Sequence, residues 1–263
     1  MAANHTGYGT AALRAIESHR KDALINDTYA SAFEGFEGRN WAYSLPGEIQ
    51  LLMIDMLAVR TRVFEEFTLT CITRKIPFYG ELTLKVSNLD DITDDFFGTL
   101  NNTLNQIVIL GAGYDTKAYR LNELVGTSVF EVDFQEVLDR KQDIAIRENI
   151  TSVCKKHSFV ASDLSEGKFD IELILAGFDT QAPTLWLIEA LSGYLTKSQN
   201  QRIIECITKL SQNGSIVIST FLGESGEASG YGKGISKKHV FYTDQGYKLF
   251  QEAGWFGNQK KIN

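Results

Sequence analysis

The sequence has few of the features that mark metal-binding, disulfide-rich or nucleic-acid-binding proteins. Its cysteines, Cys71, Cys154 and Cys206, are odd in number and widely spaced and contain no C-x-x-C pair, which argues against a disulfide framework and a zinc site. We expect no metal, and we interpret the cysteines as small buried apolar residues. No lysine or arginine cluster exceeds two residues and the net charge is −7. Binding to nucleic acid or to an anionic membrane is therefore disfavoured.

Long apolar runs are also missing. No run approaches the length that crosses a bilayer, and residues 1–7 lack a basic region followed by an apolar one. We expect a soluble, cytoplasmic protein. With 263 residues, the chain is long enough for one well-buried α/β domain with an additional cap, and short for two independent domains.

From about residue 105 onward, short apolar runs alternate with helical stretches of roughly 20 residues, a rhythm typical of βα units. Continuous apolar runs predict strands that are covered on both faces. The sequence therefore predicts an α/β fold with a Rossmann-like, doubly wound, mostly parallel sheet in residues 105–263, and a helical cap in residues 1–104. The predicted strands are Ile107 to Leu110, Ser128 to Val132, Ser158 to Ala161, Leu185 to Ile188 and Ser215 to Phe221.

The longest amphipathic stretch follows Pro46. Apolar residues mark one helical face at spacings of three, four and seven, and Arg60 falls on the same stripe. A guanidinium on an apolar face needs a partner, because burying it alone is costly. A structural ion pair or a packed stem with a solvated head is the commoner explanation, and an anionic ligand is the alternative. The stripe residues are Ile49, Met53, Met56, Val63 and Phe67.

Residues 107–121 run an apolar strand into a glycine turn and then into a helix start. Such a turn places backbone N–H groups and a helix N-terminus beside a ligand. Thr116 replaces the third glycine of the dinucleotide fingerprint, and Asp115 adds a carboxylate that suits a cation better than a pyrophosphate. S-adenosylmethionine carries an ammonium, a sulfonium and no phosphate.

Acidic residues follow the carboxyl ends of four successive predicted strands, where ligands of open α/β sheets bind. Each acid alone could also be a helix N-cap. Together, the four carboxylates could line one pocket for a cationic ligand. They are Asp115, Asp133, Asp163 and Glu189.

Five short motifs in order, with an N-terminal element Asn26–Tyr29, resemble the leucine carboxyl methyltransferase family, in its bacterial small-molecule or polyketide-type branch. The resemblance covers roughly residues 20–221. It implies a class I fold and an S-adenosylmethionine-dependent enzyme that methylates oxygen. The motifs are Arg60–Arg62, Leu110–Thr116 with Tyr119–Leu121, Phe130–Phe134 with Val137 and Lys141, Ser162–Leu164, and Glu189–Leu195.

Carried over by position, the resemblance implies that Arg60 pairs with the methionine carboxylate of the cofactor. Gly111 would approach the cofactor through its backbone, Asp133 would hold the ribose, and Glu189 would lie near the methionine amino group and the reacting end. Asp163 and Leu164 would flank the adenine. The expected cofactor site also includes Ala112, Gly113, Asp115 and Phe134.

The acceptor is left open by the sequence. A carboxylate is already ionised near neutral pH, whereas a hydroxyl must lose its proton to a base. Candidate catalytic residues are Tyr194, His239 and Tyr242, although packed aromatics and a surface histidine are the commoner interpretations. The glycine-rich segment 223–234 could be a linker-like loop or a lid.

The carboxyl-terminal part departs from the family pattern. Residues 249–255 look like the entry to a final β-hairpin, yet few residues follow Trp255. We therefore expect either that the last strands are missing or that the chain is a segment of a longer polypeptide such as a multienzyme.

The favoured function is methyl transfer to oxygen of a small molecule or a carrier-bound intermediate, for instance in secondary metabolism. Three alternatives remain: methylation of a protein C-terminal carboxyl group, an NAD(P)-dependent oxidoreductase, and a non-catalytic scaffold that keeps the cofactor site.

Overall fold

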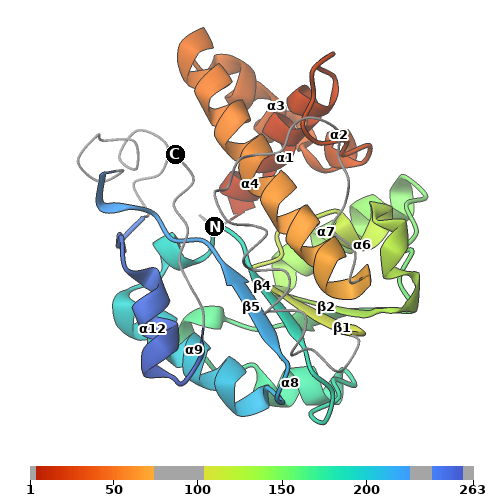
Figure 1. The fold of residues 1–263 in the computed structure, drawn as a ribbon. Helices are drawn as coiled ribbons and strands as arrows, with labels where there is room; N and C mark the ends of the chain where they lie inside the picture. Colours follow the sequence, from red (N-terminus) through yellow and green to blue (C-terminus); the bar gives the residue numbers. More distant parts are fainter. Residues whose placement is uncertain (1–3, 74–103, 226–238, 257–263) are drawn as a thin grey trace. The chain divides into compact units, whose positions relative to one another are not determined.

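The computed structural model describes residues 4–73, 104–225 and 239–256 (Figure 1), and the chain divides into two compact units. Unit 1 consists of residues 1–105, 113–129 and 135–157. Unit 2 consists of residues 106–112, 130–134 and 158–263. The predicted division into residues 1–104 and 105–263 stays a prediction.

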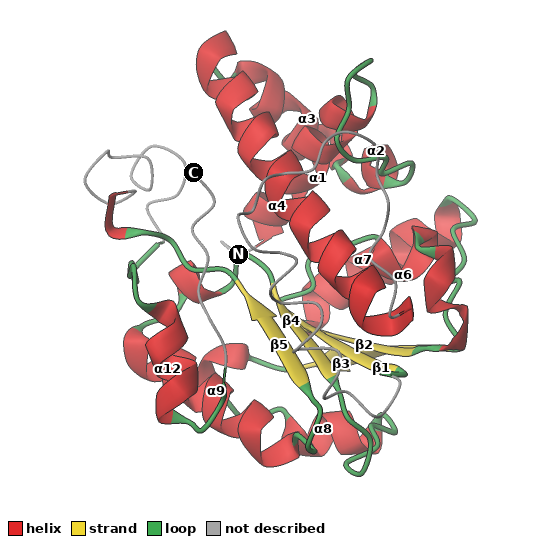
Figure 2. Ribbon diagram, in the orientation of Figure 1, coloured by secondary structure: helices red, strands yellow, loops and turns green. Residues whose placement is uncertain are grey.

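Five strands form one sheet in the order β3-β2-β1-β4-β5, drawn as neighbouring arrows in Figure 2. This confirms the predicted strands and the α/β class. The strands are β1 (Gln106–Leu110), β2 (Ser128–Asp133), β3 (Lys156–Ala161), β4 (Leu185–Ile188) and β5 (Ile216–Ser219).

The strands run parallel. Ile107 lies opposite Leu185 in the β1–β4 pair, and Leu185 lies opposite Ile216 in the β4–β5 pair. Between β1 and β2, the Ser128 N–H donates to Asn105 at the start of the strands and the Gly111 N–H donates to Val132 at their end. The carboxyl ends of these strands therefore lie at the same edge of the sheet.

The core of unit 2 explains the continuous apolar runs. Every residue of β1 and of β4 is buried, as expected for strands that are covered on both faces. The Phe178 ring contacts both Phe130 and Trp186, with centroid distances of 5.9 and 5.7 Å. These large rings fill the space between the strands and the following helices.

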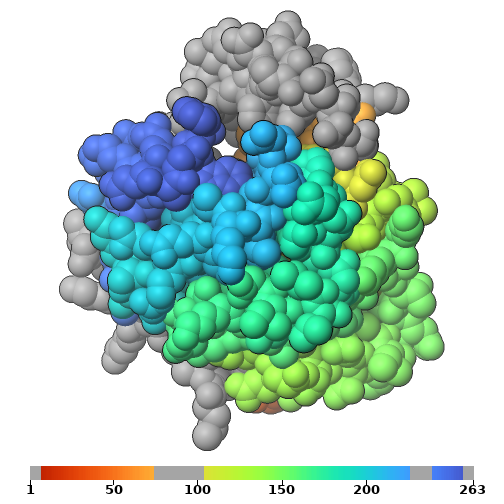
Figure 3. Space-filling model, turned by 90° about the horizontal axis from the view of Figure 1, so that it is seen from below, coloured from red at the N-terminus to blue at the C-terminus, as the bar shows by residue number. Residues whose placement is uncertain are grey.

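The helices of unit 2 include α9, which begins with a capping box in which Thr196 and Gln199 satisfy each other's backbone N–H groups. In unit 2, α9 and α12 lie side by side (Figures 1 and 3). The Trp255 Nε1 donates a hydrogen bond of 2.7 Å to Thr208 Oγ1 on α9. The helical segments are η2 (Leu164–Glu166), α8 (Asp170–Leu175), η3 (Ser192–Tyr194), α9 (Lys197–Leu210) and α12 (Gly246–Glu252).

Unit 1 has a core of stacked aromatic rings. Tyr114 stacks on Tyr8 at 4.6 Å and on Phe33 at 6.1 Å, and Phe33 also stacks on Tyr119 at 5.9 Å. The helical segments of this unit are α1 (Asn4–Ser18), α2 (Ala30–Phe33), α3 (Gly35–Ser44), α4 (Gly47–Thr73), α6 (Lys117–Arg120), η1 (Asn122–Gly126) and α7 (Gln135–Arg147).

The predicted apolar stripe of α4 is wrong. Ile49 and Met56 are 44% and 48% exposed, and the buried face is rotated by about one residue from the predicted one. The reason is that the buried face contains polar residues, so that a search for apolar periodicity passes over it. The buried residues are Met53, Ile54, Leu57, Ala58, Thr61, Phe64, Glu65, Thr68, Leu69 and Cys71.

Within residues 4–73, 104–225 and 239–256, no helix is both long and apolar enough to span a membrane, and no group of three potential metal-ligating side chains is found. Cys71, Cys154 and Cys206 are free thiols, of which Cys71 and Cys206 are buried. Most of the glycine-rich segment, residues 226–234, lies outside the described residues.

Candidate cofactor and acceptor site

The order of the strands reverses between β1 and β4. The chain moves outward from β1 through β2 to β3, and then returns to pair β4 with the other side of β1. In open α/β sheets, ligands bind outside the carboxyl ends of the strands at this switch point. Gly111 and Glu189, both predicted to contact a cofactor, directly follow β1 and β4.

The turn after β1 has a backbone that requires glycine. Gly111 has φ +69° and Gly113 has φ +48°, in the left-handed region that strains other residues. A β-carbon on Gly111 would also lie 3.1 Å from Leu191 Cδ1 in the loop after β4. The N–H groups of Gly111 and Ala112 both donate to the Val132 carbonyl, at 2.9 and 3.2 Å. The turn is thus held against the end of β2.

The predicted acidic residues of unit 2 differ in their surroundings. Asp133 and Glu189 are half-buried, whereas Asp163 is exposed. Asp133 accepts a hydrogen bond of 2.7 Å from the Phe134 N–H. Asp163 accepts one of 2.9 Å from the Ser165 N–H and thereby caps η2, as the N-cap interpretation expects. The predicted cofactor contacts of these residues stay predictions.

Two further predicted residues adjoin these acids. The Phe134 side chain is 38% exposed beside Asp133, and Leu164 is 6% exposed beside Asp163. The residue after Glu189, Ala190, has φ +56°, a conformation that is uncommon for alanine and that recurs at functional sites. The Ala190 N–H donates to Thr220 Oγ1 at 2.8 Å, which joins the loop after β4 to the residue following β5.

Asp115, in unit 1, has a cationic partner on its own turn. Its carboxylate accepts hydrogen bonds from the Lys117 backbone N–H at 2.7 Å and from Lys117 Nζ at 2.6 Å. Burial would raise the pKa of Asp115, but the ammonium groups of Lys117 and Lys141 outweigh it and hold the pKa well below its usual range. This carboxylate is therefore ionised and partnered by lysine.

The two arginines of the α4 motif are both half-buried. The Arg62 Nε donates to Glu66 at 2.6 Å, and its Nη1 donates to the Leu24 carbonyl at 3.0 Å. Arg62 is therefore held by protein groups. Pairing of Arg60 with a carboxylate of the cofactor stays a prediction.

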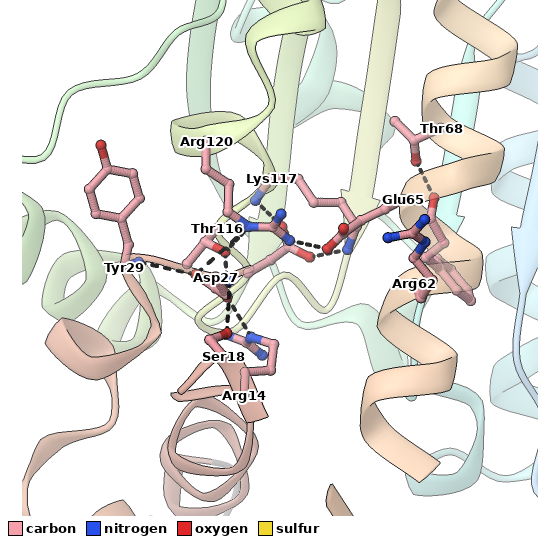
Figure 4. Close-up of polar contacts among 12 residues, drawn as sticks. Arg14, Ser18, Asp27, Tyr29, Arg62, Glu65, Thr68, Thr116, Lys117 and Arg120 are labelled. Carbon is pink, nitrogen blue, oxygen red and sulfur yellow. Dashed lines mark hydrogen bonds and ion pairs between the residues drawn. The ribbon is translucent and has the colours of Figure 1, made fainter. Parts of the chain in front are cut away.

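A buried charge network in unit 1 was not predicted from the sequence (Figure 4). Asp27, whose side chain is fully buried, accepts hydrogen bonds from Arg14 Nε at 2.8 Å and from Thr116 Oγ1 at 2.7 Å. Arg120 lies 3.7 Å from Asp27 and also pairs with Glu65 on α4. We call these residues the Asp27 network: Arg14, Asp27, Glu65, Thr116 and Arg120.

The Asp27 network joins α1, α4 and the residues that follow the glycine turn. The Arg14 Nη2 also donates to the Tyr114 carbonyl at 2.6 Å. Burial would raise the pKa of Asp27, but the charges of Arg14 and Arg120 outweigh it and lower the pKa. The signals in the sequence were the Asn26–Tyr29 element and the motif that contains Thr116 and Arg120, which a resemblance could locate but to which no partners could be assigned.

The three candidate catalytic residues come together in unit 2. The rings of Tyr194 and His239 are 4.5 Å apart, and those of His239 and Tyr242 are 6.5 Å apart and nearly perpendicular. Tyr194 belongs to η3 after β4. The residues that follow His239 are hydrogen-bonded to η3, because the Val240 N–H donates to the Gly193 carbonyl at 2.8 Å.

The parallel sheet, its strand order and the glycine turn form a Rossmann-like α/β fold. A sequence model of the family "Leucine carboxyl methyltransferase" matches residues 7–208, and the chain belongs to this family. A protein of Mycobacterium bovis named "Putative S-adenosyl-L-methionine-dependent methyltransferase" is 32% identical over 213 residues, which are 81% of this chain and 62% of that protein.

A Mycolicibacterium smegmatis protein with a similar name is 30% identical over 261 residues, covering 95% of this chain and 75% of the relative. Among solved structures, an O-methyltransferase family protein from Burkholderia thailandensis matches with a TM-score of 0.45 and 11% identity, covering 66% of this chain and 53% of that one. The chain spans 62% of the length of the first relative.

Proposed function

We propose that this chain is an S-adenosylmethionine-dependent methyltransferase that transfers the methyl group to oxygen of a small molecule or of a carrier-bound intermediate. The observation that carries the proposal is the switch point between β1 and β4, where the left-handed Gly111 and the half-buried Glu189 follow adjacent strands. Relatives that cover most of this chain are named as S-adenosylmethionine-dependent enzymes.

The residues present fit such a cofactor. Gly111 has no side chain and a left-handed φ of +69°, so the turn can approach a ligand closely. In this proposal the Asp133 carboxylate accepts hydrogen bonds from the ribose hydroxyls, and Glu189 attracts the ammonium group. Arg60 pairs with the carboxylate of the cofactor. The cofactor supplies an electrophilic methyl carbon on a sulfonium.

The protein's part in the reaction is alignment. Methyl transfer is an in-line displacement, so the acceptor oxygen, the carbon and the sulfur must be held on one line and water must be kept away. In this proposal, nearby carboxylates favour binding of the charged donor, and the turn after β1 holds the donor in one place.

Cofactor identity can be tested by thermal unfolding in parallel titrations with S-adenosylhomocysteine and NADH. A ligand that binds only the folded state stabilises it by about 2.7 kcal/mol at 100 times its Kd. We expect S-adenosylhomocysteine to raise the Tm and NADH to leave it unchanged, and the opposite result would favour an oxidoreductase. In the Asp133→Asn variant the rise should be smaller. The control is Asp170→Asn, which removes an exposed pair with Lys209.

The atom that is methylated can be identified from the product. Incubation with methyl-labelled cofactor and parallel pools of phenols, alcohols, carboxylic acids, amines and thiols should give label that is bound through oxygen. A methyl ester releases methanol in mild base and a methyl ether does not, so this treatment separates carboxyl from hydroxyl acceptors. Label recovered only on nitrogen or sulfur would contradict O-methylation.

A further inference from the structure

The aromatic cluster of Tyr194, His239 and Tyr242 is held in place by neighbouring residues. Gly193 and Leu222 fix it from two sides, because a β-carbon on Gly193 would lie 2.6 Å from Leu222 Cδ1 and 3.2 Å from the His239 ring. Hydrogen bonds from Val240 and Thr243 to the carbonyls of Gly193 and Leu222 hold the segment in place. The cluster is therefore packed tightly and lies in the loops that follow β4 and β5.

The imidazole of His239 is half-buried. Its Nδ1 is buried, with no hydrogen-bond partner among the described residues. The titratable groups in ring contact with it are Tyr194, from η3, and Tyr242, from its own segment. Burial lowers the pKa of His239 below its ordinary value, so the ring is mostly neutral at pH 7. A neutral imidazole can accept a proton.

The rings of Tyr194 and Tyr242 contact that of His239, and further aromatic side chains lie in the same part of the chain. Phe241 lies beside it in the chain and packs edge-on against Phe221, with a centroid distance of 6.3 Å. Phe221 in turn contacts Phe250 at 6.2 Å. Aromatic side chains favour a planar apolar ligand, because such a ligand can stack on their rings or pack edge-on against them.

On the basis of the proposed function, we propose that His239 is the general base of the transfer and that the acceptor is a phenolic or enolic hydroxyl on a planar ring. The chain segment after β4 carries both Glu189, which we propose to bind the donor, and Tyr194 of η3, so both residues belong to unit 2. Tyr194 and Tyr242 would pack along the acceptor ring.

In this step the acceptor O–H proton moves to an imidazole nitrogen of His239, and an oxygen lone pair forms the new O–CH3 bond. The electron pair of the breaking S–CH3 bond stays on sulfur, which becomes a neutral thioether. The imidazolium then releases its proton to water. A phenolic hydroxyl has a pKa of about 10, so an imidazole can remove its proton far more readily than that of an aliphatic alcohol, and a carboxylate needs no base.

Binding at His239 can be tested without knowing the natural acceptor. Wild-type protein loaded with S-adenosylhomocysteine is titrated with phenol and, separately, with benzoate, while the imidazole signals are followed by NMR. Loss of one signal in His239→Gln assigns the residue. We expect phenol to shift the His239 signal and benzoate to shift it much less. Equal shifts, no shift with phenol, or a His239 that is charged at pH 7 would overturn the proposal.

Turnover provides the second measurement, on a pool of phenols and enols. His239→Gln should lower kcat by about 100-fold or more, as expected for loss of a general base, with an unchanged Kd for S-adenosylhomocysteine. The rate of the wild type should fall as the pH drops through the His239 pKa, and the variant should lack this limb. His19→Gln, which removes an imidazole bonded to Ala15 at the end of α1, is the control and should keep the wild-type rate.

The two proposals fail in different ways. A wild-type protein that does not bind S-adenosylhomocysteine contradicts the proposed function itself. A protein that binds it and methylates only carboxylates, at a rate that His239→Gln leaves unchanged, contradicts only the role of His239. If His239→Gln does not fold, His239→Asn provides the second variant. It also lacks an imidazole and should show the same fall in kcat and the same loss of the pH limb.

Discussion

At the scale of single residues, Arg60 and Arg62 of α4 allow a test of cofactor binding in which one variant is the control for the other. Arg60→Ala should weaken S-adenosylhomocysteine binding about 30-fold, or ~2 kcal/mol, because the cofactor carboxylate would lose its charged partner. Calorimetric titration measures the Kd. Arg62→Ala is the control, since Arg62 is bonded to Glu66 and to the Leu24 carbonyl, and it should alter stability more than affinity. An unchanged Kd in Arg60→Ala would refute the carboxylate assignment.

Glycine is needed at position 111 for two independent reasons, the positive φ and the nearness of Leu191. Gly111→Ala should therefore lower the free energy of unfolding by about 1–2 kcal/mol from the backbone alone, and more from the Leu191 contact. Chemical denaturation provides the measurement. Gly126→Ala is the control, because nothing lies within 4 Å of its β-carbon position, and it should be close to neutral.

At the scale of elements, the Asp27 network should determine how unit 1 responds to acid. The pKa of Asp27 is lowered in the folded state. Its stabilisation is therefore complete above the unfolded pKa of about 3.9 and is lost as the pH falls through the folded value. Asp27→Asn should cost about 3–5 kcal/mol near neutral pH, since Arg14 and Arg120 both lose a buried anionic neighbour, although Arg120 keeps its pair with Glu65. The measurement is the free energy of unfolding as a function of pH.

At acidic pH, the free energy of unfolding should change less steeply with pH in Asp27→Asn than in the wild type. Asp22→Asn is the control: Asp22 pairs with Arg20 but its side chain is 75% exposed, so solvent screens the pair and the change should be small. A profile of Asp27→Asn that is parallel to that of the wild type would show that Asp27 does not titrate with folding.

The sequence was sufficient to predict the five strands, because each is short and centred on β-branched, leucine or aromatic residues, and β1 and β4 are nearly continuous apolar runs. It was insufficient for the buried face of α4, where Thr61, Glu65 and Thr68 are covered. Glu65 is buried because Arg120 pairs with it, and a partner more than 50 positions away is invisible to local periodicity. For the same reason the partners of Asp27 could be found only from the fold.

The candidate site was partly predictable. The positions of Gly111, Asp133 and Glu189 followed from the rule that ligands bind at strand ends. That Asp115 pairs with Lys117 did not follow, because both residues lie on one short turn whose backbone had to be known. The contact between Tyr194 and His239 also required the loops after β4 and β5 to be placed.

At the scale of the whole molecule, each unit contains one buried thiol that can report on its opening. Burial raises the pKa of Cys71, in unit 1, to about 12 and that of Cys206, in unit 2, to about 11. In a Cys154→Ser background, a thiol reagent at pH 8 should modify either cysteine only when its unit opens.

We expect S-adenosylhomocysteine to slow the modification of Cys206, because ligand bound at the ends of the strands stabilises the closed form of unit 2. Mass spectrometry after timed labelling gives the two rates separately. Immediate labelling of Cys206 in the native protein would show that its burial is not maintained in solution. A Cys206 rate unaffected by ligand would show that the ligand does not stabilise unit 2.

The contact between Gly111 and Leu191 has an evolutionary consequence. Because a β-carbon at position 111 would lie only 3.1 Å from Leu191 Cδ1, the leucine has to move when residue 111 gains a side chain, and we expect substitutions at the two positions to be coupled. Related sequences with a larger residue at position 111 should therefore carry a smaller one at position 191. Covariation of these two positions in an alignment of the family would show that the loops after β1 and β4 have evolved together.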